Sequence, residues 1–114
     1  MDNLQKHNDY SYAHGNYCSA VEHLATGADR IQERLLGAFL QYLHAIQPNN
    51  VPDELLSDYQ FVTDTLTSKP GRNKFEGAIH VTLASMGDET AMEVARRIVS
   101  LCHNIGVILE DMSL

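Results

Sequence analysis

Hydrophobic residues recur every three or four positions along most of this chain, and the first such run covers residues 9–25. The apolar members of this run are Tyr10, Ala13, Tyr17, Ala20, Val21 and Leu24. This spacing is that of one face of an α-helix, and Asn8 or Asp9 is a suitable N-cap residue. Residues 1–8 lack the pattern, so we expect them to form a flexible N-terminal tail.

A second helical run follows, from about residue 26 to residue 47. Thr26 and Asp29 have the spacing of a capping box with Asp in place of Glu, which predicts a new helix at this point. A single long kinked helix through both runs is the alternative. The apolar positions are Ala28, Ile31, Leu35, Leu36, Ala38, Phe39, Leu40, Tyr42, Leu43 and Ile46. So wide an apolar arc needs more than one neighbour, or an oligomer contact as well as a core.

Three further elements follow the turn at residues 48–52. Pro52 suits the first position of a third helix, whose core stripe we predict as Leu55, Tyr59, Val62 and Leu66. Residues 75–86 fit either a helix or a strand, and we favour the helix because a lone short strand would lack a pairing partner. Asp88 is a natural cap for the last helix, which we expect to end near Asp111. Its predicted core stripe comprises Ala91, Val94, Ala95, Ile98, Leu101, Cys102, Ile105, Ile108 and Met112.

These elements predict an all-α fold, a compact antiparallel bundle of four to five helices in one domain over residues 9–114. A chain of 114 residues is long enough for one ordinary core. The N-terminus has no signal-peptide pattern, and no run reaches the ~18 apolar residues of a membrane helix. We therefore expect a cytoplasmic protein without a membrane partner.

Charge narrows the set of partners. The net charge is −7, with eight basic and fifteen acidic residues, which argues against direct binding of nucleic acid. Three of the eight basic residues, Lys69, Arg72 and Lys74, lie in one turn before the predicted helix at 75–86. Together with His80 they form a candidate site for a small anionic, nucleotide-like ligand or for an acidic partner.

The six histidines and two cysteines raise the question of a metal site. His14 and Cys18 stand four residues apart on one predicted helix, with Glu22 four further on. A closed zinc site needs four ligands, so Cys102, His103 or His7 would have to join. With no Cys-x-x-Cys or His-Glu-x-x-His motif, we expect no metal cofactor and keep His14 and Cys18 as weak candidates. The two cysteines are expected to be small packing residues, unless the fold brings them together for a disulfide.

Catalytic signatures are missing from the sequence. His80-Val81-Thr82 resembles the His-x-Thr element of the two-histidine phosphoesterases, but such enzymes need two copies and a longer α/β chain. We therefore expect no enzymatic activity.

The chain carries more aromatic and aliphatic residues than a small core needs. The candidate interface residues are Tyr12, Tyr17, Phe39, Leu40 and Leu43, because tyrosine is enriched in interface cores and the others line the broad arc at 26–47. The sequence thus favours a small acidic helical interaction module, an accessory, regulatory or inhibitory subunit that self-associates or docks on a larger protein. The alternative is a binder of a nucleotide-like anion at the turn from Lys69 to Lys74.

Overall fold

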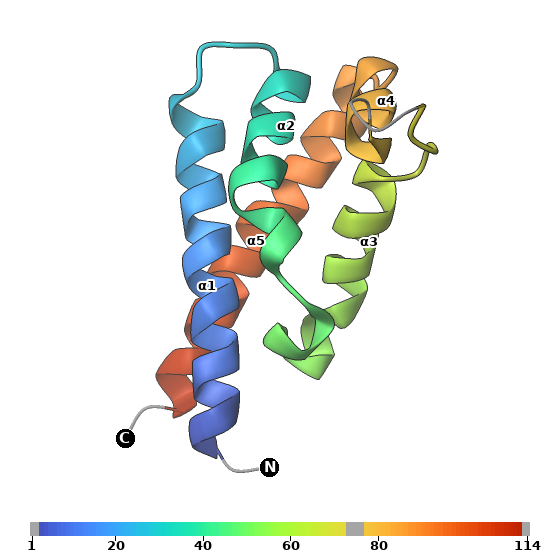
Figure 1. Cartoon of the computed structure of the whole chain (residues 1–114). Helices are drawn as coiled ribbons and strands as arrows, with labels where there is room; N and C mark the ends of the chain where they lie inside the picture. Colours follow the sequence, from blue (N-terminus) through green and yellow to red (C-terminus); the bar gives the residue numbers. More distant parts are fainter. Residues whose placement is uncertain (1–2, 73–76, 113–114) are drawn as a thin grey trace.

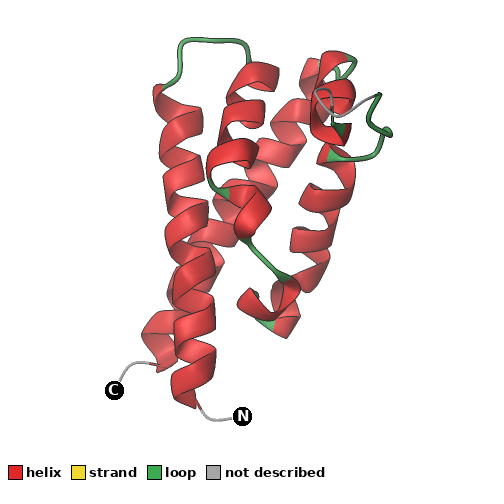
Figure 2. Cartoon of the chain, viewed as in Figure 1, coloured by secondary structure: helices red, strands yellow, loops and turns green. Residues whose placement is uncertain are grey.

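Two long helices, α1 (Asn3–Thr26) and α5 (Asp88–Met112), run antiparallel through the molecule (Figure 1). The computed structural model describes residues 3–72 and 77–112, and within these ranges every regular element is helical (Figure 2). Helix α1 begins at Asn3 rather than near Asp9. Residues 3–8, expected as an N-terminal tail, therefore form its first turns.

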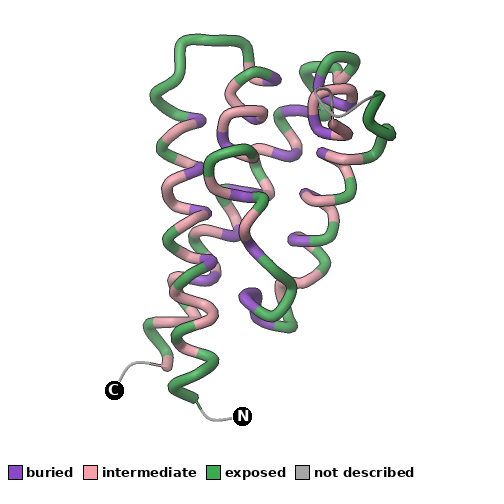
Figure 3. Tube along the Cα trace, viewed as in Figure 1, coloured by how far each residue is buried: buried purple, intermediate pink, exposed green. Residues whose placement is uncertain are grey.

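Helices α1 and α5 meet along the apolar stripes that the sequence predicts. On α5 the buried residues are Ala91, Val94, Ile98, Leu101 and Ile105, and on α1 they are Ala13, Tyr17, Ala20 and Leu24. The steps of three and four residues place each set on one side of its helix. Figure 3 shows buried segments recurring along both helices. Ala13 and Ala20 are fully buried, and the close approach of the two helices is seen at Cys18 and Cys102, whose Cα atoms lie 5.4 Å apart.

Helix α2 (Ile31–Gln41) packs against α1, α4 and α5, so its wide apolar arc does meet several neighbours. The predicted start at Thr26 is wrong. Thr26 is the last residue of α1, and its hydroxyl donates a hydrogen bond to the backbone carbonyl of Glu22 at 2.9 Å. Arg34 holds the intervening turn, since its guanidinium donates to the carbonyls of Leu24 at 2.7 Å and Asp29 at 2.8 Å. The first two helices are therefore separate.

The chain after α2 forms three short 3-10 turns instead of continuing as a helix to Gln47. They are η1 (Leu43–Ala45), η2 (Pro48–Asn50) and η3 (Asp53–Leu55). Asn50 fixes this stretch, because its side-chain oxygen accepts a hydrogen bond from the backbone N–H of Gln47 at 2.8 Å and its side-chain nitrogen donates to the backbone carbonyl of Asp9 at 3.3 Å. Pro52 precedes η3 rather than opening the third long helix.

Helices α3 (Leu56–Leu66) and α4 (Ala78–Ala84) complete the bundle. Tyr59, Val62 and Leu66 are buried as predicted. The segment at 75–86, which fitted either a helix or a strand, contains the helix α4, and Phe75 lies outside the described residues.

The all-α prediction is confirmed: the structure is a helical bundle with one hydrophobic core. Residues from all five α-helices contribute to that core. No helix in the described part of the chain is both long and apolar enough to cross a membrane.

Candidate functional site

An open groove of about 750 Å³ runs along the surface where α1, the start of α2 and the first half of α5 come together. Its volume falls within the range of about 300–1,000 Å³ that is usual for ligand-binding clefts. Most of its surface is apolar. The residues lining it are Val21, Leu24, Ala25, Arg30, Ile31, Arg34, Asp88, Met92, Ala95, Arg96 and Val99.

The apolar floor of the groove is exposed to solvent. Met92 and Val99 are each 49% exposed, and they belong to the few large apolar side chains of the described residues that are exposed to this degree. They stand seven residues apart on α5, so both lie on the same face of that helix. The two side chains are therefore available for contact with a molecule that enters the groove.

The rim of the groove is cationic, although the protein carries a net charge of −7. Three arginines, Arg30, Arg34 and Arg96, line it together with a single carboxylate, Asp88. That carboxylate is already engaged, because Oδ1 of Asp88 accepts a hydrogen bond of 2.8 Å from the buried side chain of Gln32. The groove therefore attracts negative charge.

The three arginines differ in how far they are neutralised. Arg34 donates to two backbone carbonyls. It has no carboxylate partner within the described residues, so its charge is not neutralised. The Arg30 side chain has neither a hydrogen bond nor an ion pair within the described residues. Arg96 pairs with Glu93 at 2.9 Å on the exposed face of α5. Hydrogen bonds from Arg97 and Arg96 hold the pKa of Glu93 below its usual value.

The residues predicted as an interface are only partly on the surface, and none of them lines the groove. Tyr12 and Leu40 are exposed, and Phe39 is half-buried. Tyr17 and Leu43 are core residues, 2% and 7% exposed, so their assignment to an interface is wrong. Met92 and Val99 are not among the predicted interface residues, and their spacing of seven residues with Arg96 between them is a visible but weak signal in the sequence.

The predicted anion-binding residues do not form one constellation in the described part of the chain. Lys69 lines a hollow of about 180 Å³, where its Nζ donates to the hydroxyl of Ser85 at 2.6 Å. Arg72 is exposed and His80 is half-buried on α4, and neither lines that hollow. Lys74 lies outside the described residues. The hollow is smaller than a usual ligand cleft.

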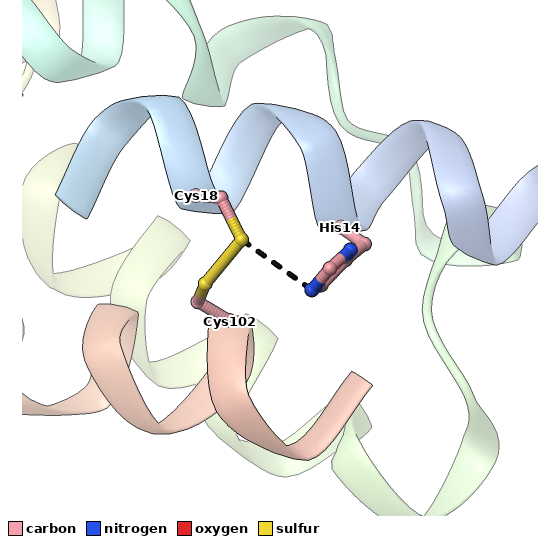
Figure 4. The surroundings of a disulfide bond; sticks show 3 residues. All are labelled: His14, Cys18 and Cys102. Carbon is pink, nitrogen blue, oxygen red and sulfur yellow. Dashed lines mark hydrogen bonds between the residues drawn. A yellow bond between two sulfur atoms is a disulfide. The ribbon is translucent and has the colours of Figure 1, made fainter. Parts of the chain in front are cut away.

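The fold does bring the two cysteines together. Cys18 on α1 and Cys102 on α5 form a disulfide, with their Cα atoms 5.4 Å apart (Figure 4). Of the two alternatives that the sequence left open, packing residues or a disulfide, the structure therefore contains the disulfide. Nε2 of His14 lies 3.4 Å from Sγ of Cys18. Glu22 and His103 are exposed and stay outside this cluster.

Comparison of the chain with protein-family models, with curated proteins and with solved structures returned no match. The fold and the groove define an all-α bundle with an apolar, arginine-rimmed surface cleft. Its function has to be inferred from its own residues.

Proposed function

We propose that this protein is a small acidic helical interaction module, an accessory, regulatory or inhibitory subunit that docks on a larger protein. Its docking site is the groove between α1, α2 and α5, and the occupant is an amphipathic helix of the partner with acidic residues beside its apolar face. The observation that carries this proposal is the combination of an exposed apolar floor with a cationic rim on an acidic chain.

The floor supplies the affinity in this proposal. Met92 and Val99 are half exposed in the free protein, and a bound helix would remove that apolar surface from water. Helix-in-groove recognition uses apolar anchors at helical spacing, which match a floor that follows one face of α5. Methionine adapts its shape to different side chains, a property that suits binding surfaces.

The rim supplies the choice of partner. Arg30 and Arg34 have no carboxylate partner within the described residues, and the Arg96–Glu93 pair is exposed and therefore weak. Glutamate or aspartate at the edges of an incoming helix would pair with these guanidinium groups. Complementary charge of this kind favours the acidic partner and speeds its association.

The test uses two synthetic helical peptides that share one leucine-rich face. The first has glutamates along the edges of that face and the second has lysines there. We expect the acidic peptide to bind in fluorescence anisotropy, more weakly at high salt, and the basic peptide not to bind. Met92→Lys and Arg30→Glu should each weaken binding at least about tenfold, since central anchors and charge reversals typically cost more than 1 kcal/mol.

Arg72→Glu is the matched control, because it reverses one exposed positive charge away from the groove. It should leave binding of the acidic peptide within about twofold of the unmutated protein, as expected for a remote surface charge. Equal binding of both peptides, or equal loss in Arg30→Glu and Arg72→Glu, would contradict the proposal. A dimer in sedimentation equilibrium that Met92→Lys dissociates would instead identify a second copy as the occupant.

Two finer expectations accompany this proposal. The first is a cytoplasmic location, which stays a prediction. The second is the alternative of a nucleotide-like anion at the turn from Lys69 to Lys74, which the small hollow at Lys69 supports less well than the groove supports a helix. A rise in melting temperature with nucleoside phosphates, lost in Arg72→Ala, would favour that alternative.

A further inference from the structure

Three metal-ligating atoms converge between helices α1 and α5. Nε2 of His14 and Sγ of Cys18 come from α1, and Sγ of Cys102 comes from α5 (Figure 4). These atoms all lie within 4.8 Å of one another. In a tetrahedral zinc site, bond lengths of about 2.3 Å to sulfur and 2.0–2.1 Å to nitrogen place the two ligand atoms about 3.5 Å apart. The distance from His14 Nε2 to Cys18 Sγ is 3.4 Å.

The backbone of α5 makes room for the histidine ring. A Cβ atom at Gly106, one helical turn after Cys102, would lie 2.9 Å from Nε2 of His14, which is closer than real Cβ contacts. Glycine in a helix interior costs about 1 kcal/mol relative to alanine. The absence of a Cβ atom at Gly106 therefore leaves room for the His14 ring beside the two sulfurs.

We propose that the dithiol form of the protein binds Zn²⁺ through His14, Cys18 and Cys102. Within the described residues no fourth His, Cys, Asp or Glu joins this group, so the fourth coordination position is open to water or an exogenous ligand. Two thiolates and an imidazole are the donors that zinc prefers, whereas Mg²⁺ and Ca²⁺ prefer oxygen. All three residues are half-buried, which leaves the cluster accessible to an ion from solvent.

Disulfide and metal are mutually exclusive states of the same residues. A phosphine reductant splits the sulfur–sulfur bond, takes the oxygen of one water as its oxide, and leaves that water's two protons on the sulfurs. Zinc then displaces both thiol protons when it binds. Hydrogen peroxide reverses the sequence, because the two thiolates give it two electrons, form the disulfide and release Zn²⁺ with two hydroxides. In a reducing compartment such a cysteine pair persists as the dithiol, which is the metal-binding state.

The test compares the oxidised protein with the same protein reduced by phosphine and freed of metal. Competition with a chromophoric chelator should give one Zn²⁺ per reduced chain and none per oxidised chain. Co²⁺, used as a spectroscopic probe, should show the intense bands of a tetrahedral site together with thiolate charge transfer. Circular dichroism checks that the reduced chain is folded.

His14→Ala should weaken zinc binding by at least about 100-fold, since even outer-shell partners are worth about 10- to 100-fold. The matched control is His103→Ala, which removes an exposed histidine next to Cys102 but outside the cluster, and it should bind as the unmutated protein does. His14→Gln, which keeps a polar side chain of similar reach, serves if the alanine variant does not fold. A folded reduced chain that binds no zinc, or equal affinity in the variants at His14 and His103, would overturn the proposal.

Discussion

The disulfide between Cys18 and Cys102 should contribute several kcal/mol to the stability of this protein, about 2–4 kcal/mol. It joins residues 84 positions apart and so closes most of the chain into one loop. In the chain-entropy model a loop of that length restricts the unfolded state by about 4.5 kcal/mol at 25 °C. Measured values are commonly 2–4 kcal/mol, because the unfolded state keeps some structure. We therefore expect reduction to remove about 2–4 kcal/mol of the free energy of unfolding.

Urea titration followed by circular dichroism measures this loss, with and without phosphine and with a chelator in both samples. With a slope of about 1–3 kcal/mol/M, the midpoint should fall by at least about 0.7 M of urea. A Cys18→Ser/Cys102→Ser double variant should unfold near the reduced protein and ignore phosphine. Thiol titration reports whether the bond was cut. Identical midpoints for chains with and without free thiols would refute the loop-entropy reasoning.

Three further substitutions test the packing and the charges. Leu101→Ala should lower the free energy of unfolding by about 2–5 kcal/mol in urea titrations, because Leu101 is 0% exposed. Arg97→Ala should cost about 1–2 kcal/mol in the same assay, because this guanidinium lies 3.0 Å from Asp58 on α3 and covers the ring of Phe61. Burial raises the pKa of Tyr17 above its ordinary value of 10.0. The folded state therefore holds the phenol proton more tightly than the unfolded state does. The resulting contribution to the free energy of unfolding is fully present below pH 10 and is lost as the pH rises through the raised pKa of the folded state. Tyr17→Phe should flatten this alkaline decline when unfolding is measured on both sides of pH 10.

Each of these variants has a control on the same helix. Val107→Ala removes an exposed α5 side chain and should change stability by no more than about 0.5 kcal/mol. Arg96→Ala removes an arginine with no partner on α3, so it should cost less than Arg97→Ala. Tyr12→Phe alters an exposed phenol and should leave the alkaline decline in place. A control that matches its test variant would contradict the stated cause.

The helical periodicity of the sequence determines the fold class and most of the core. The steps of three and four residues on α3 and α5 identify their buried faces, since a helix turns through a fixed angle per residue. The same rule predicts the ion pair between Glu93 and Arg97, which the structure contains at 3.0 Å. Local patterns are less informative about where a helix begins or ends. Thr26 is the last residue of α1 and not the start of α2.

Only the tertiary structure decides which faces meet and which stay uncovered. Tyr17 and Leu43 become core residues because neighbouring elements cover them, whereas Met92 and Val99 stay exposed because nothing in the described chain lies over that side of α5. The pairing of Cys18 with Cys102 depends on the antiparallel register of α1 and α5. Periodicity gives the direction of a side chain around its own helix axis, but the distance between two helices and their relative shift depend on packing across the whole core. For that reason the groove and the cysteine–histidine cluster, each assembled from more than one helix, emerge only in three dimensions.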